Sequence, residues 1–221
     1  MIKGVLFDLD GTLLNTNDLI IKSFQETFKH YYPQRAFTLQ EIIDCIGPTL
    51  EQTAMKYYPQ NIEEMVQMYR YHYVIHHDEL ITIYPGIEEM IKSLKELGLK
   101  LAIVTSKKRD MTIKAMEHTK ILDYFDLIIS SDEVINPKPH QEPIELALKG
   151  LNLLKDEVIM VGDNSHDIEC ANHANVKSVG VGWALKGADY LRDFNPTYII
   201  KTANELIEII KKEGINDGKN L

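Results

Sequence analysis

Two acidic side chains near the start of the chain have types and spacing suited to metal or phosphate chemistry. Asp8 and Asp10 directly follow the apolar run Gly4–Phe7, which predicts a strand buried on both faces of a parallel sheet. Ligands bind at the carboxyl ends of such strands. Two positions apart on an extended chain, the two carboxylates point to the same side, and a cation or a shared proton must relieve their repulsion. A hard cation such as Mg²⁺ suits them.

Ordinary turns and calcium loops also place Asp and Gly after a strand. A calcium loop needs acidic or amide side chains at alternate positions and a Glu further downstream, whereas Thr12, Leu13 and Leu14 follow here. The calcium loop is therefore excluded by spacing, and the turn has to be judged against the rest of the chain.

Three more expected strand ends carry polar groups suited to phosphoryl chemistry. Thr105 and Ser106 offer hydroxyls and the first amides of a following helix. Lys138 lies between two prolines, which restrict the backbone around its ammonium group. Asp163 and Asp167 follow an apolar strand in a G-D-x-x-x-D pattern. Taken alone, the Thr-Ser pair fits a helix cap and the lysine fits a surface turn. Together these segments favour a phosphate site.

Composition limits the classes of protein to which the chain can belong. With 221 residues and 44% hydrophobic composition, it can bury one sizeable core and a second small unit. A net charge of −9 argues against nucleic acid as a partner, since clustered Lys and Arg bind phosphate backbones. Neither a membrane-spanning run nor a signal-peptide pattern is present, so we expect a cytoplasmic protein with no membrane partner. Cys45 and Cys170 predict neither a disulfide framework nor a thiolate zinc site.

The order of expected elements divides the chain into two units. Residues 16–83 predict a small helical bundle, with helices near 19–31, 39–46, 49–58 and 62–77. Residues 1–15 and 84–221 alternate strands and helices, which predicts an α/β unit with a parallel sheet covered on both faces. Its strands are expected at 4–7, 100–105, 126–129, 157–161, 178–181 and 198–200, and its helices at 86–97, 109–118, 142–151, 167–174 and 203–212. The polar tail 214–221 is expected to be frayed.

Four segments in register carry a resemblance to a known family. DLDGT, VTS, the lysine of NPKP, and GDNSHD match in order and spacing the motifs of the haloacid dehalogenase superfamily of phosphohydrolases. The resemblance implies a Rossmann-like parallel sheet as core. It also implies that the helical insertion after the first motif, residues 16–83, is a cap domain on a core of residues 1–15 and 84–221.

The resemblance implies a role for each motif residue. Asp8 would attack phosphorus and form an aspartyl-phosphate, and Asp10 would protonate the leaving oxygen and then activate water. Mg²⁺ would be the cofactor, held by the Asp8 carboxylate, the Asp10 backbone carbonyl and Asp163, with Asp167 supporting. The phosphoryl oxygens and the rest of the substrate would contact Thr105, Ser106, Lys138 and Gly47 of the cap. Asp10 is absent from the metal-free dehalogenases of the superfamily, so the phosphatase pattern is intact here.

Segments 16–21, 30–33 and 46–50 are most similar to those of a subgroup that hydrolyses inorganic pyrophosphate. Phosphoglycolate and other small phosphate monoesters are the alternatives, because the cap loop Gly47 to Glu51 contains no basic residue that would select among them. A phosphosugar mutase is disfavoured by Ile20, where mutases of this group carry His. A non-catalytic phosphate-binding module is disfavoured by the complete set of motif acids. We expect a monomer or a weak homo-oligomer.

A cluster of histidines lies in the last expected helix of the insertion. His72, His76 and His77 occur at helical spacing beside Asp78. This pattern could hold a metal ion, but a solvated helix face is the favoured interpretation.

Overall fold

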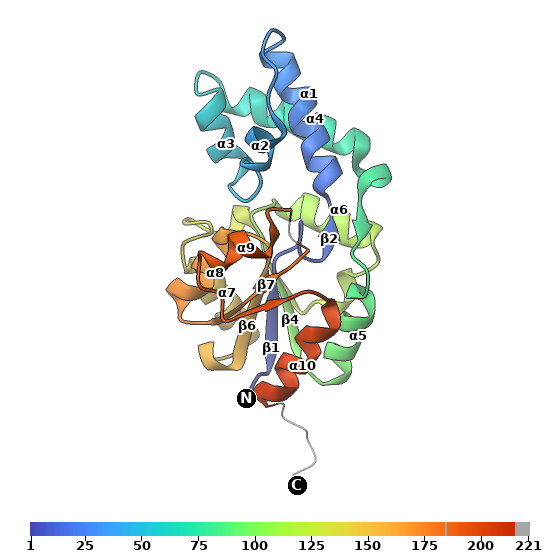
Figure 1. Ribbon diagram of the computed structural model, residues 1–221, viewed down its shortest axis with the longest axis vertical. Helices are drawn as coiled ribbons and strands as arrows, with labels where there is room; N and C mark the ends of the chain where they lie inside the picture. Colours follow the sequence, from blue (N-terminus) through green and yellow to red (C-terminus); the bar gives the residue numbers. More distant parts are fainter. Residues whose placement is uncertain (184, 215–221) are drawn as a thin grey trace.

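A parallel sheet forms the centre of the protein in the computed structural model, which describes residues 1–183 and 185–214 (Figure 1). The sheet is six-stranded with the order β5-β4-β1-β6-β7-β8, and every neighbouring pair is parallel. This confirms the predicted α/β class. The strands are β1 (Gly4–Phe7), β4 (Lys100–Val104), β5 (Leu127–Ile129), β6 (Val158–Gly162), β7 (Lys177–Val181) and β8 (Tyr198–Ile200).

Helices cover both faces of this sheet because successive strand residues point to opposite sides. Val5 and Phe7 of β1 belong to one core, whereas Leu6 belongs to the other. The first core includes side chains of α5 (Ile87–Glu96), α6 (Arg109–His118) and α10 (Ala203–Glu213), and the second includes those of α7 (Glu142–Leu151) and α8 (Ser165–Ala174). All four residues of β1 are therefore buried, which explains its continuous apolar sequence.

Four helices lie beyond the carboxyl edge of the sheet and are called here the cap helices (Figure 1). They are α1 (Asn17–Tyr31), α2 (Leu39–Ile43), α3 (Leu50–Tyr57) and α4 (Ile62–Leu80). α1 and α4 pack against each other, and the rings of Phe24 and Tyr69 meet at 4.5 Å between them. Phe28 stacks on Phe37 at 4.2 Å and extends this aromatic core toward α2.

The helix predicted for residues 39–46 ends early, at Ile43. Its start is fixed by a capping box between Thr38 and Glu41. After Asp44 the chain turns toward the sheet, where the Ile46 carbonyl accepts a hydrogen bond of 3.0 Å from Asn164 Nδ2. This contact to the sheet edge replaces a further helical turn.

Both chain crossings between the cap helices and the sheet contain an element that the sequence did not predict. β2 (Leu14–Asn15) pairs with β3 (Thr82–Ile83) in antiparallel orientation. Two-residue strands are too short to show a period of two, so sequence patterns cannot reveal them. The short helix α9 (Gly187–Arg192) and the 3₁₀ turns Leu122–Tyr124, Ser131–Glu133 and Lys155–Glu157 were also not predicted. Residues 215–221 of the predicted frayed tail lie outside the described residues.

The expected solvated face of histidines on α4 is wrong for His77. His72 and His76 are partly exposed, but His77 is fully buried, and its Nδ1 lies 2.6 Å from Asp78 Oδ1. The buried ring packs against Tyr73 and against His118 of α6.

Within the described residues, no helix combines the length and the apolar character needed to cross a membrane.

Candidate active site

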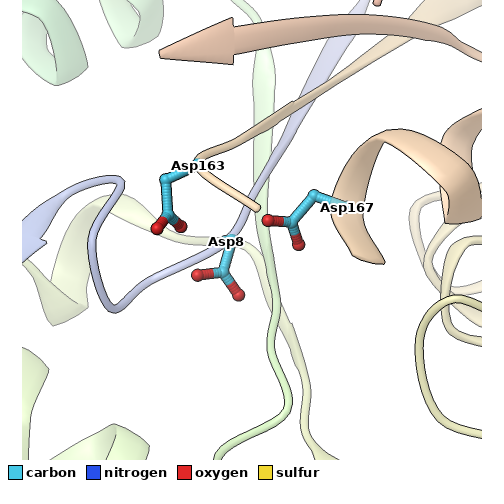
Figure 2. Close-up of side chains that lie close together, drawn as sticks. All are labelled: Asp8, Asp163 and Asp167. Atoms are coloured by element: carbon cyan, nitrogen blue, oxygen red, sulfur yellow. The ribbon is translucent and has the colours of Figure 1, made fainter. Parts of the chain in front are cut away.

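Three buried carboxylates meet at the carboxyl edge of the sheet, as Figure 2 shows. Asp8 follows β1, Asp163 follows β6, and Asp167 lies in the first turn of α8. One oxygen of each lies within 4.8 Å of an oxygen of the others. Because β1 and β6 are parallel neighbours, the loops after both strands emerge side by side. The sheet therefore brings Asp8 close to two acids that follow it in the sequence by more than 150 positions.

Lys138 is the buried cation of this cluster. Its Nζ donates hydrogen bonds to Asp8 Oδ1 and Asp167 Oδ1, both at 2.6 Å, and to the Val104 carbonyl at 3.0 Å. An ammonium group has three protons, so these acceptors use all of its donors. Burial alone would lower the pKa of Lys138, but the carboxylates of Asp167 and Asp8 outweigh it and raise the pKa. The lysine thus stays charged and bridges two of the three acids.

Asp163 is held by the turn that follows β1. Thr12 Oγ1 donates to Asp163 Oδ1 at 3.0 Å. Gly11 has a φ of +85°, and a Cβ at this position would lie 2.3 Å from Asp163 Oδ2. Only glycine allows both the backbone conformation and the close approach of this carboxylate.

The charges of the cluster fit a divalent cation. Asp8, Asp163 and Asp167 supply three carboxylates, and Lys138 neutralises only one charge. Burial raises the pKa of Asp8 to about 7 against the opposing effect of Lys138. Burial also raises the pKa of Asp163 well above its usual range, and the neighbouring Asp167 and Asp8 add to this shift. Mg²⁺ prefers oxygen ligands, and these closely spaced carboxylates carry more negative charge than Lys138 neutralises.

Asp10 lies apart from this cluster and has a cationic partner of its own. Lys107 Nζ donates to Asp10 Oδ1 and Oδ2 at 2.9 and 3.0 Å, and it also contacts the hydroxyl of Tyr73 from α4. Sequence reasoning missed both Lys107 and Tyr73. Lys107 follows directly on the Thr105-Ser106 pair, which was the available signal, whereas the contact of Tyr73 depends on how α4 packs over the sheet.

The Thr105-Ser106 segment lies in a loop. The helix expected from Arg109 is confirmed, and its N-cap residue is Lys108. The amides of Thr105 and Ser106 therefore precede this helix, and the expectation that they are its first amides is wrong. Thr105 Oγ1 accepts a hydrogen bond of 3.2 Å from the Lys107 amide, which fixes the turn after β4. Thr105 is buried and Ser106 is half-buried, and both line the same cavity as Asp8.

This cavity lies between the sheet edge and the cap helices and has a volume of about 120 Å³. Pockets for drug-sized ligands are larger, at roughly 300 Å³ or more, so the site suits a small substrate. Gly47 reaches it from the cap; its φ is +118°, and a Cβ there would lie 2.8 Å from the Asn164 side chain. The cavity is lined by all the candidate site residues, namely Asp8, Asp10, Gly47, Thr105, Ser106, Lys138, Asp163 and Asp167. His166, Arg70 and Lys107 line it as well.

A parallel sheet with this acidic edge and a buried lysine defines a hydrolase of the haloacid dehalogenase type. The family model of haloacid dehalogenase-like hydrolases matches residues 5–181, which is most of the chain. The chain belongs to this family, and it is therefore an enzyme.

Two relatives with a named enzyme activity match nearly the whole chain. The chain is 46% identical over 209 residues to the pyrophosphatase PpaX of Halalkalibacterium halodurans, covering 95% of this chain and 97% of that protein. It is 43% identical over 212 residues to the pyrophosphatase PpaX of Listeria monocytogenes, covering 96% and 98%.

Solved structures agree with the fold assignment. A phosphatase from Clostridium acetobutylicum, described as predicted, superposes with a TM-score of 0.85 at 28% identity, covering 96% of this chain and all of that one. A haloacid dehalogenase-like hydrolase from Streptococcus pneumoniae superposes with a TM-score of 0.83 at 26% identity, covering 94% and 98%. The arrangement of cap helices over the sheet is thus shared with other hydrolases of the family.

Proposed function

We propose that this protein is a Mg²⁺-dependent phosphohydrolase that hydrolyses inorganic pyrophosphate. The observation that carries the proposal is the buried cluster of Asp8, Asp163, Asp167 and Lys138, which lines a small cavity. The relatives named pyrophosphatase PpaX, which match nearly the full length, favour pyrophosphate as the substrate. The position of each group in the cavity supports the role proposed for it.

Asp8 is proposed as the nucleophile. A carboxylate oxygen of Asp8 attacks one phosphorus atom, the bond from this phosphorus to the bridging oxygen breaks, and an aspartyl-phosphate forms. Lys138, at 2.6 Å from Asp8, holds the carboxylate in place and offsets the negative charge that gathers as the two anions approach. Thr105 and Ser106, on the neighbouring strand end, line the cavity where the transferred phosphoryl oxygens would lie.

Asp10 is proposed as the general acid and base. It gives a proton to the departing phosphate in the first step and takes a proton from water in the second, so its protonation is restored at the end of each cycle. Water attacks the aspartyl-phosphate, and Asp8 and a second phosphate are released. The contacts of Lys107 with both Asp10 oxygens hold this side chain at the cavity wall.

The Asp8 carboxylate, the Asp10 backbone carbonyl and Asp163 are proposed to hold Mg²⁺, with Asp167 in support. The bound ion would neutralise phosphoryl oxygens and help to orient them for in-line attack. Asp167 receives one hydrogen bond from Lys138, and its other oxygen accepts from the Asn164 amide at 3.0 Å. These contacts suit a residue that orients its neighbours.

We further propose that residues 16–83 act as a cap domain on a core formed by residues 1–15 and 84–221. The paired β2 and β3 segments, which carry both crossings, lie at the proposed boundary. Closure of such a cap excludes water from the reacting phosphoryl group.

The first test is phosphate release in the presence of Mg²⁺ from pyrophosphate, 2-phosphoglycolate and a sugar phosphate, with Asp8→Asn as the blank. Pyrophosphate is expected to exceed the monoesters in kcat/KM by at least about tenfold, which is about 1.4 kcal/mol of transition-state preference. Preference for a monoester would overturn the substrate and leave the phosphohydrolase proposal standing. Turnover by Asp8→Asn equal to that of the unsubstituted protein would overturn the catalytic proposal.

A further inference from the structure

Among the residues that the structure describes, three cationic side chains line the cavity, and their hydrogen-bond donors have different partners. Lys138 donates to Asp8, Asp167 and the Val104 carbonyl. Lys107 contacts both oxygens of Asp10 and the hydroxyl of Tyr73. Both lysines are thus engaged with the protein itself. The third cation, Arg70, lines the same cavity from the cap.

Arg70 is only weakly engaged by protein groups. Its nearest acidic partner among the described residues is Glu51, with an N–O distance of 3.6 Å, beyond the usual hydrogen-bond range. Glu51 is shared with Lys108, at 3.7 Å, and its own side chain is 46% exposed. A guanidinium group carries five donors in a planar fork. Most of the donors of Arg70 therefore stay available to a ligand in the cavity.

Arg70 lies on α4 of the cap helices, whereas Asp8 follows β1 of the sheet, so the two side chains line the cavity from different parts of the fold. Its neighbours Tyr69 and Tyr73 on the same helix also line the cavity, and Tyr73 reaches Lys107 at the sheet edge. The phosphoryl group that Asp8 attacks must lie against the sheet edge. The remainder of a small substrate then lies against α4.

The balance of charges in the cavity indicates which kind of ligand Arg70 would bind. When Asp10 carries the proton that it gives to the leaving group, Asp8, Asp163 and Asp167 supply three negative charges, and the two lysines and a divalent cation would supply four positive charges. A polyanionic substrate needs more positive charge than this small excess. Arg70 adds a positive charge on the cap side, where the leaving group would be.

We propose that Arg70 binds the anionic leaving half of the substrate, which is the second phosphoryl group of pyrophosphate. This inference rests on the proposed function. Arginine suits the task because its fork pairs with two oxygens of a phosphate at once. Arg70 thereby selects substrates whose leaving group is an anion, although the cap loop Gly47 to Glu51 contains no basic residue.

The test compares Arg70→Gln with the unsubstituted protein on pyrophosphate and on phenyl phosphate, whose leaving group carries no second anionic site. Loss of a charge-assisted contact is expected to lower kcat/KM for pyrophosphate about 10- to 100-fold, with phenyl phosphate turnover nearly unchanged. Arg70→Lys is expected to recover part of the loss. An equal loss on both substrates would overturn the proposal, because it would indicate a structural role.

Binding provides a readout that is independent of turnover. The Kd of imidodiphosphate, a pyrophosphate analogue with a P–N–P bridge, is expected to rise at least about tenfold in Arg70→Gln, whereas the Kd of inorganic phosphate stays the same. The matched control is Glu51→Gln, which removes the ion-pair partner of Arg70. It should keep affinity for imidodiphosphate, and a loss equal to that of Arg70→Gln would show that the pair only holds the cap together.

Failure of the proposed function gives a different pattern. If the unsubstituted protein prefers 2-phosphoglycolate, the pyrophosphate assignment is wrong. A loss of kcat/KM in Arg70→Gln on 2-phosphoglycolate but not on phenyl phosphate would then still support an anion contact at Arg70. An equal loss of kcat/KM on phenyl phosphate would still overturn this contact.

Discussion

Lys138 is the single residue on which the acidic cluster most depends. It is 4% exposed and bridges Asp8 and Asp167. Removing one partner from a buried ion cluster leaves uncompensated charge, which typically costs about 3–5 kcal/mol. Lys138→Met is therefore expected to lower the free energy of unfolding by about this amount in chelator near pH 8, as measured by urea denaturation, and to abolish phosphate release.

The matched control is Lys92→Met. Lys92 forms an exposed pair with Glu88 one helical turn away, and exposed pairs of this kind contribute little to stability. A urea midpoint for Lys138→Met equal to that of Lys92→Met would contradict the assigned role of the buried lysine.

At the scale of elements, the turn after β1 positions the whole site. Gly11→Ala is expected to displace Asp163, because the new Cβ would lie 2.3 Å from its carboxylate. A displacement of about 1 Å at a reacting centre can cost about 100-fold in rate, so we expect at least this loss in kcat/KM in a phosphate-release assay. Gly98→Ala is the control, since Gly98 also has a positive φ, but a Cβ added there would meet no atom of another described residue within 4 Å.

Both glycine substitutions require a left-handed backbone, which costs about 1–2 kcal/mol for a residue with a Cβ. A urea titration is expected to show this cost in Gly11→Ala and Gly98→Ala alike. Full activity of Gly11→Ala at reduced stability would mean that the turn does not position the acids.

The same elements explain which parts of the site were predictable from sequence. Asp8 and Asp163 could be placed together because they directly follow parallel strands, whose carboxyl ends share one edge. Lys138 lies further from the end of β5 and was placed with them through the motifs in register. Arg70 and Tyr73 could not be placed, since their place in the cavity depends on the rotation and docking of α4, which side-chain packing sets. The early end of α2 likewise follows from the contact of Ile46 with Asn164, and such a distant contact leaves no local pattern in the sequence.

At the scale of the whole molecule, hydrogen bonds join the cap region to the sheet edge beside the cavity. Tyr73 contacts Lys107, and the Ile46 carbonyl accepts from Asn164 Nδ2 at 3.0 Å and from Lys186 Nζ at 3.3 Å. These contacts hold the cap helices against the edge of the sheet that carries the acids of the cavity.

Stability of the whole molecule should depend on pH and Mg²⁺ together. The pKa of Asp8 is raised to about 7 and that of Asp163 is also raised, so the folded metal-free protein keeps protons that the unfolded chain releases above about pH 4. Their contribution to the free energy of unfolding is fully present below about pH 4 and declines as pH rises through the folded values. Mg²⁺ competes with these protons, so its stabilising effect should increase over the same interval.

Urea denaturation with and without Mg²⁺ between about pH 5 and about pH 8 measures this linkage. A metal that binds only the folded state adds about 2.7 kcal/mol at about 100 times its Kd, and we expect this gain at the upper end of the range and much less at the lower end. Asp163→Asn removes one carboxyl group whose pKa is raised, so the stabilisation by Mg²⁺ should depend less on pH in this variant. A gain from Mg²⁺ that is the same at both ends, or that Asp163→Asn leaves intact, would mean that the cation binds away from the buried acids.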